Sequence, residues 1–223
     1  MGTRLLRIYR TLLRAYGHAG WWPARTAFEV CLGAILAQNT AWVNVERTLE
    51  GLRQRRLLSF DALDRLSVAR LAPLLRSSGT YRVKARRLRA FLDFLGREYR
   101  GRVGLFESQE PGVLRAQLLG VTGIGPETAD VITLYAARFP SFVVDSYTRR
   151  VFERLGELRG GESYADVQEL FHRQLPRDSG LYGDYHAQIV RLAKQACRRR
   201  PLCGVCPIEA SCAKRGVSPE VRA

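Results

Sequence analysis

The chain has 223 residues, 46% of them hydrophobic, which is enough to bury a substantial core as one domain or as two modest ones. Its formal net charge of +15, carried mostly by arginine, favours a polyanionic partner, either a nucleic acid or an anionic membrane surface. Arginines interrupt each N-terminal apolar stretch and no apolar run approaches the length of about 18–20 residues that spans a bilayer. We therefore expect a soluble protein of the cell interior, without a signal peptide.

Apolar residues repeat at helical spacing nearly throughout, beginning with a one-sided stripe that runs from Leu5 to Tyr16. The same spacing predicts helices over residues 28–37, 42–52, 60–66, 68–75 and 84–99. No convincing run of alternating apolar and polar residues indicates a strand. The expected fold class is therefore all-α.

The stretch LLGVTGIGPETAD, residues 118–130, carries the most specific pattern. Residues 114–119 end one helix, and Pro126 stands where the next begins, because its fixed φ suits a first helical turn. Between them, Gly123 and Gly125 permit conformations and close approach that a Cβ would block. Such a hairpin can aim amide N–H groups at an anion, and phosphate fits the net charge. The alternative is an ordinary helix–helix turn.

Together, LLGVTGIGPETADVI and FVVDSYTRRVFERLG resemble the helix-hairpin-helix and aspartate module of the endonuclease III superfamily of DNA glycosylases. LGAILAQNT resembles the family's DNA-facing glutamine loop, and GTYRVKARRL resembles its loop that wedges into the duplex. The resemblance covers nearly the whole chain. It implies two helical domains that flank a DNA cleft, residues 27–139 with the hairpin and residues 1–26 plus 140–223 with a metal site. We expect a cytoplasmic, nucleoid-associated monomer that makes no membrane contact and binds double-stranded DNA with a flipped damaged base.

Asp145 follows the apolar residues FVV and precedes a helix expected to start near Ser146, a position suited to an N-cap. By resemblance it is the catalytic aspartate, which would stabilise cationic character on the sugar and help water attack C1′. Bifunctional members carry a lysine two residues after the second hairpin glycine, which forms a Schiff base and permits strand cleavage. That position is Glu127 here, and a carboxylate cannot form an imine. The sequence therefore predicts a monofunctional glycosylase.

Four of the five cysteines form a C-x5-C-x2-C-x5-C pattern, namely Cys197, Cys203, Cys206 and Cys212. Thiolates this close together can surround one compact cluster, whereas structural zinc usually takes two pairs separated by a longer loop. We expect a [4Fe–4S] cluster that acts as a structural staple, although the first gap is one residue shorter than in the endonuclease III pattern. Zinc is the alternative. The fifth cysteine, Cys31, is expected to be a buried core thiol.

The residues WWP and QNT-x-W resemble the 3-methyladenine glycosylase branch, in which aromatic side chains sandwich the flipped base. An alkylated purine carries positive charge, which aromatic faces attract. The pocket candidates are Trp21, Trp22, Trp42, Tyr147 and His186. Each tryptophan has the alternative role of filling the core.

Two other functions stay open at this point. An endonuclease III-like glycosylase/AP lyase on oxidised pyrimidines is the second candidate, because the 3-methyladenine branch does not uniformly keep a cluster. A non-catalytic helix-hairpin-helix DNA-binding protein is the third. Asp145 argues against this last candidate, whereas Glu127 is compatible with it.

Further DNA contacts are expected outside the hairpin. Three arginines of the first cysteine gap are predicted to contact phosphates: Arg198, Arg199 and Arg200. By resemblance, Gln38 would fill the gap left by the extruded base. Thr80 or Tyr81 would press between the strands, and Lys84 would touch the backbone nearby.

Overall fold

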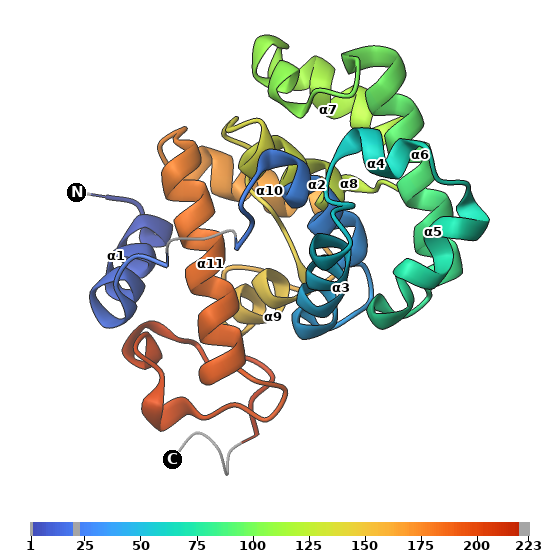
Figure 1. Cartoon of the computed structure of the whole chain (residues 1–223). Coiled ribbons are helices and arrows are strands. Elements are labelled where there is room, and N and C mark those ends of the chain that lie inside the picture. The colour runs from blue at the N-terminus through green and yellow to red at the C-terminus, as the bar shows by residue number, and fades with distance from the viewer. Residues whose placement is uncertain (1, 20–22, 219–223) are drawn as a thin grey trace. The chain divides into compact units, whose positions relative to one another are not determined.

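The computed structural model describes residues 2–19 and 23–218 (Figure 1). Every regular element in these residues is helical, which confirms the predicted all-α class. None of the described helices combines the length and the apolar character needed to cross a bilayer. The chain divides into two compact units. One is Pro23–Phe139, and the other contains the described residues on either side of it.

The Pro23–Phe139 unit is built around a helix that is apolar on nearly all sides. This helix is α2 (Ala27–Leu36), whose residues from Glu29 onward are all buried, as expected for a helix without a polar face. It packs against α3, α6 and α8 and against a π-helical turn. The elements of this unit are α2, α3 (Trp42–Gln54), α4 (Phe60–Asp64), α5 (Val68–Leu74), η1 (Arg76–Ser78), α6 (Tyr81–Tyr99), η2 (Val103–Ser108), α7 (Pro111–Leu119), α8 (Pro126–Val131) and η3 (Ile132–Ala136).

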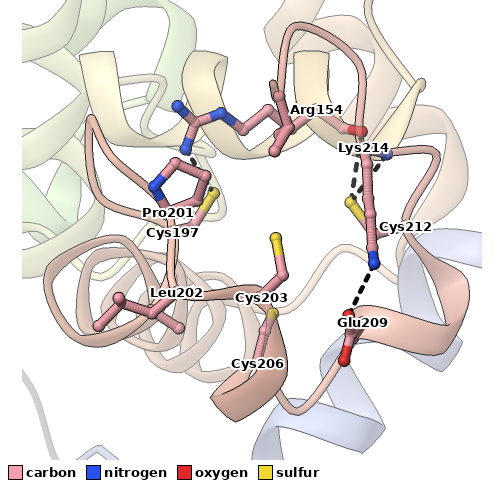
Figure 2. Close-up of a pocket in the computed structure, with 11 residues that line it drawn as sticks. Arg154, Cys197, Pro201, Leu202, Cys203, Cys206, Glu209, Cys212 and Lys214 are labelled. Atoms are coloured by element: carbon pink, nitrogen blue, oxygen red, sulfur yellow. Dashed lines mark hydrogen bonds and ion pairs between the residues drawn. The ribbon is translucent and has the colours of Figure 1, made fainter. Parts of the chain in front are cut away.

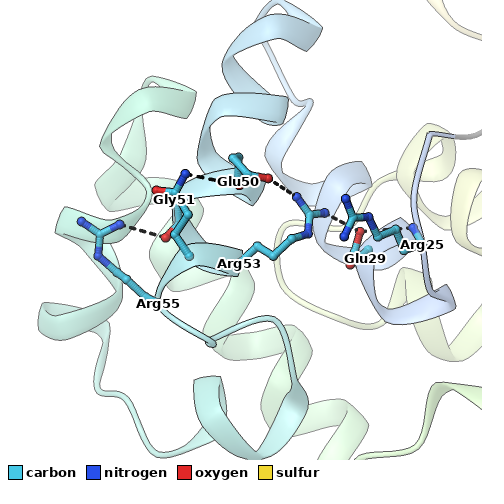
Figure 3. A network of polar contacts seen from close by, with 7 residues as sticks. Arg25, Glu29, Glu50, Gly51, Arg53 and Arg55 are labelled. Atoms are coloured by element: carbon cyan, nitrogen blue, oxygen red, sulfur yellow. Dashed lines mark hydrogen bonds and ion pairs between the residues drawn. The ribbon is translucent and has the colours of Figure 1, made fainter.

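A polar network fixes the start of α2 against α3 (Figure 3). Glu29 is buried, and its Oε2 accepts hydrogen bonds from the Arg25 amide at 3.2 Å and from Arg53 Nη2 at 3.0 Å. Arg53 also pairs with Glu50 on its own helix. The Arg53 guanidinium and the Arg25 amide thus replace the water that the Glu29 carboxylate loses on burial.

The second unit has an aromatic core between its helices. It contains α1 (Arg4–Tyr16), α9 (Ser146–Leu155), α10 (Tyr164–Gln174), α11 (Ser179–Gln195), η4 (Cys203–Val205) and η5 (Glu209–Ser211). The rings of Phe142 and Phe171 stack at 3.8 Å between centroids. Tyr185 of α11 meets both rings edge-on and donates its hydroxyl to the Leu5 carbonyl of α1 at 2.9 Å. Rings of this size supply much of the buried apolar area of a small unit.

A bidentate ion pair joins the two helices of the hairpin. Arg115 of α7 donates Nε and Nη2 to the two carboxylate oxygens of Asp130 on α8, at 2.8 and 3.0 Å. The Asp130 side chain is fully buried. Paired, parallel hydrogen bonds of this kind fix orientation as well as distance, so the angle between α7 and α8 depends on this contact.

Replacing Arg115 with Met should therefore destabilise the protein strongly, because the buried Asp130 carboxylate loses its guanidinium partner. We expect the free energy of unfolding, measured by urea denaturation, to fall by about 3 kcal/mol. Arg97→Met is the matched control. It removes an exposed pair with Glu98, whose side chains are 70% and 39% exposed, and should cost less than about 1 kcal/mol. Equal, small losses in the two variants would contradict the role given to Arg115.

Candidate active site

Asp145 is held by the first turn of α9, which it caps. Its backbone is extended, and its Oδ1 accepts hydrogen bonds from the Thr148 amide at 2.7 Å and the Thr148 hydroxyl at 2.8 Å. An N-cap carboxylate satisfies orphan amides and lies at the positive end of the helix dipole. Only 12% of the Asp145 side chain is exposed. The carboxylate is thus fixed in place and reachable over a small part of its surface.

His186 of α11 faces the second oxygen of this carboxylate. Its Nε2 lies 3.6 Å from Asp145 Oδ2, and the imidazole is 5% exposed. Burial alone would raise the pKa of the Asp145 carboxyl, but His186 and the two Thr148 donors outweigh burial and hold that pKa below its usual value. Asp145 is consequently an ionised carboxylate at neutral pH. The sequence indicated His186 as a pocket residue, and the structure places it beside the candidate catalytic group.

The aromatic candidates are spread over both units. Tyr147 is partly buried two residues after Asp145, with the guanidinium carbon of Arg150 lying 5.1 Å from its ring centroid. Trp42 begins α3 in the Pro23–Phe139 unit and donates Nε1 to Glu46 at 2.8 Å. Trp21 and Trp22 lie outside the described residues. Of the five pocket candidates, the structure therefore brings His186 and Tyr147 to the neighbourhood of Asp145 along α9 and α11.

The hairpin connects α7 to α8, with Glu127 exposed in the first turn of α8. Gly123 has φ +87°, a conformation that disfavours other residues. Gly125 has φ −95°, which any residue can adopt, and nothing in the protein would meet a Cβ built on it. The predicted need for special backbone geometry is therefore real at Gly123. At Gly125 neither the backbone conformation nor a neighbouring atom of the protein requires glycine. The residue faces open space.

Gln38 is bonded to the hairpin. Its Nε2 donates to the Gly123 carbonyl and to the Thr128 hydroxyl, both at 3.0 Å, and its Oε1 accepts from Arg87. Two segments that the sequence separates widely, the glutamine loop and the hairpin, thus lie side by side in the same unit.

The first turn of α6 and the residue that caps it contain both an exposed candidate and a corrected one. Thr80 is exposed and has φ +35°, which is strained for a β-branched residue. Tyr81 is partly buried, with Arg76 and Arg82 near its ring. Lys84, in contrast, is 1% exposed, and its Nζ donates to the carbonyls of Leu36 and Ser78. The prediction that Lys84 touches the DNA backbone is therefore wrong in this structure, because its ammonium is enclosed by the protein.

The four C-terminal cysteines line one pocket (Figure 2). Arg154 of α9 donates Nη1 to Cys197 Sγ at 3.3 Å, and the Lys214 amide donates to Cys212 Sγ at 3.3 Å. Burial raises the pKa of the Cys206 thiol to about 11. Across residues 2–19 and 23–218, no three His, Cys, Asp or Glu side chains are arranged to share a single metal ion. Cys31 is fully buried in α2, as expected.

Hydrogen bonds to backbone carbonyls fix the arginine segment between Cys197 and Cys203. Arg154 donates to the carbonyls of Arg198 and Arg199, at 2.5 and 2.9 Å, while the side chains of Arg198, Arg199 and Arg200 are exposed. Sequence reasoning missed Arg154, which joins the helix capped by Asp145 to the cysteine loop. Only its spacing on α9, nine residues or about two and a half turns beyond Asp145, could have indicated it.

A family model and several known proteins match this chain. The family model described as "HhH-GPD superfamily base excision DNA repair protein" matches residues 32–177. The chain is 42% identical over 209 residues to MJ1434 of Methanocaldococcus jannaschii, provisionally named a DNA repair glycosylase, covering 93% of this chain and 95% of that protein. It is 28% identical over 189 residues to endonuclease III of Thermotoga maritima, covering 83% and 82%.

Two solved structures are also similar. The Helicobacter pylori 3-methyladenine DNA glycosylase MagIII, bound to 1,N6-ethenoadenine, superposes with a TM-score of 0.75 at 27% identity, covering 86% of this chain and 97% of that one. A trapped endonuclease III–DNA covalent intermediate superposes with a TM-score of 0.81 at 22% identity, covering 96% and 97%. The second likeness shows a shared fold.

Thr148→Val should raise the pKa of Asp145, because it removes a hydroxyl that donates to the ionised form. Titration of the Asp145 carboxyl by carbon NMR measures this directly. Since the lowered pKa gives stability that is lost as pH falls, the stability advantage of wild type over the variant should shrink on acidification below about pH 4. Thr133→Val, at a buried threonine of the other unit, is the control and should leave Asp145 unchanged. An unshifted Asp145 in Thr148→Val would refute this account of its charge.

Proposed function

This chain belongs to the HhH-GPD superfamily of base excision repair DNA glycosylases and has the endonuclease III-like fold, and we propose that it is a monofunctional member. It would hydrolyse the N-glycosidic bond of a damaged base and leave the DNA strand intact. The observation that carries the proposal is the combination of a fixed, ionised Asp145 with a carboxylate, Glu127, where bifunctional relatives place lysine.

Asp145 supplies the charge that the reaction needs. Breaking a glycosidic bond develops positive character on the sugar, and a negative charge held close to it lowers the energy of that state without reorganisation during the reaction. One Asp145 oxygen is occupied by Thr148, whereas the other faces His186 at 3.6 Å. We assign this second oxygen to the developing cation and to the attacking water. His186 helps to keep the carboxylate ionised.

Glu127 determines what happens after base loss. A neutral amine can attack C1′, form an imine and so permit strand cleavage. Glu127 lies at the start of α8, and its side chain offers no such nucleophile. The product is therefore an abasic site in an unbroken strand.

DNA is the partner of this family, and the exposed candidates fit that role. We propose that the hairpin at Gly123 and Gly125 binds phosphate and that the arginines at 198–200 bind the backbone elsewhere. The open space in front of Gly125 and the exposure of these arginines support this assignment. Gln38, Thr80 and Tyr81 would enter the duplex where the damaged base leaves it, and the protein would act as a monomer.

The proposed substrate is an alkylated purine such as 3-methyladenine. The similarity to MagIII, whose structure holds 1,N6-ethenoadenine, supports this class. Tyr147 next to Asp145 supplies one aromatic ring, and aromatic faces attract a cationic base. Arg150 already lies over the Tyr147 ring, so a base would use the ring's other face or displace Arg150.

Oxidised pyrimidines are the second candidate substrate, processed by a glycosylase/AP lyase. The four cysteines favour this second candidate, because their spacing resembles the cysteine pattern of endonuclease III. Glu127 weighs against its lyase step.

We further propose that the four cysteines hold a [4Fe–4S] cluster. They fit it in two respects: all four line one pocket, and the sulfurs of Cys197 and Cys212 accept N–H hydrogen bonds from Arg154 and Lys214, which would stabilise thiolates. Zinc is the alternative, although structural zinc sites usually take two pairs of thiolates separated by a longer loop. When bound, the cluster would join the two ends of the C-terminal loop, from Cys197 just after α11 to Cys212.

A panel of duplexes with alkylated, oxidised, deaminated and mismatched bases tests the reaction. We expect base release from the alkylated purine duplexes, with strand breaks only after alkali treatment. Borohydride should trap no covalent adduct, with an endonuclease III as the positive control. Strand breaks without alkali, or a robust trapped adduct, would refute the monofunctional assignment. Release of only oxidised, deaminated or mismatched bases would refute the substrate class.

Anaerobic purification tests the metal assignment. We expect a brown protein with a broad visible absorption band and about four iron atoms per chain. Cys206→Ser should lose iron and lower the thermal stability, whereas Cys31→Ser, at a thiol far along the chain from the others, should keep its iron. A colourless protein with about one zinc per chain would contradict the cluster.

A further inference from the structure

Lys84 is a buried cation whose partners are two helix C-termini. Its Nζ donates to the carbonyl of Leu36, the last residue of α2, at 2.8 Å, and to that of Ser78, the last residue of η1. Terminal carbonyls lack intrahelical partners and lie at the negative end of the helix dipole. The Lys84 charge, 1% exposed, is therefore compensated by two backbone ends rather than by a carboxylate.

Each of these carbonyls lies two residues before a side chain that is proposed to enter the duplex. Leu36 precedes Gln38, and Ser78 precedes Thr80. The Lys84 ammonium thus fixes the distance between Leu36, where the glutamine loop begins, and Ser78, where the Thr80 loop begins. Thr80 follows Gly79, and both have positive φ, so the second loop leaves η1 in a conformation that needs outside support.

Arg87, one helical turn after Lys84, extends this link to the hairpin. It donates to Gln38 Oε1, while Gln38 Nε2 donates to the Gly123 carbonyl and the Thr128 hydroxyl. The Arg87 stem lies directly over Gly123: a Cβ added there would be 2.7 Å from Arg87 Cδ and closer still to its Cγ. Gly123 therefore has a second reason to be glycine, beyond its positive φ.

We propose that Lys84 and Arg87 are positioning residues through which α6 holds the glutamine loop, the Thr80 loop and the hairpin as one rigid DNA-opening surface. The inference deepens the proposed function, because it assigns to Lys84 and Arg87 the task of fixing the residues that are proposed to contact DNA. Preformed loops lose less conformational entropy on binding. The link should therefore increase the affinity for DNA whose strands the protein must separate more than the affinity for DNA that is already open.

The test uses Lys84→Met and Arg87→Met in the full chain, with Arg97→Met on the same helix as the control for lost charge. The DNA is a duplex with a stable abasic-site analogue and 2-aminopurine opposite it, whose fluorescence reports unstacking. We expect the first two variants to bind this duplex about tenfold more weakly and to lose the fluorescence rise. Arg97→Met should behave like wild type. All variants should bind undamaged duplex, and an analogue placed in a preformed bubble, within about twofold of wild type.

Several outcomes would overturn the inference. Wild-type fluorescence signals in Lys84→Met and Arg87→Met would do so, as would equal weakening on all three DNAs or the absence of any rise with wild type. If thermal melts show Lys84→Met to be unfolded, Arg87→Met decides, since its side chain is only partly buried. None of these readouts needs base release. A wild-type protein that opens the duplex but excises nothing would refute the proposed function and leave this inference testable.

Discussion

The hydrogen bonds between Asp145 and Thr148 begin a helix and hold a charge at the same time. The cap satisfies the first amides of α9, and His186 together with these contacts keeps the carboxylate ionised despite its burial. The remaining oxygen faces His186. A site of this kind needs no mobile part to create its charge, because the folding of α9 and the packing of His186 from α11 already do so. The proposed chemistry therefore depends on the stability of the N-terminal end of α9 and on its contact with α11.

Buried charges have a comparable role in the Pro23–Phe139 unit. Arg115 and Asp130 orient the hairpin helices, and Lys84 spans the ends of α2 and η1. None of these contacts resembles a ligand site, yet each fixes a loop that we propose to contact DNA. Ionic groups are costly to bury unless they are fully paired. Their presence behind the loops suggests that precise loop placement is worth that cost.

Much of this fold is readable from the sequence, because apolar spacing is a local property. The periodicity predicted the helices from α2 to α6, although it started α6 at Lys84, three residues late. The hairpin and the cysteine quartet are likewise local patterns. The partnership of Asp145 with His186 joins residues far apart in the chain, so sequence spacing could not reveal it. Lys84 was misassigned for a related reason: its DNA contact was inferred from the resemblance of its segment to a DNA-facing loop, whereas its burial depends on where α2 and η1 end in space.

The most direct test of the account compares Asp145→Asn with wild type under single-turnover conditions on an alkylated-purine duplex, together with binding to an abasic-analogue duplex. Asparagine keeps the size of the residue and one oxygen that can accept the two Thr148 hydrogen bonds, but it removes the charge. The account predicts a loss of base release of at least about 100-fold, with binding within about threefold of wild type. Base release by Asp145→Asn at the wild-type rate would contradict it.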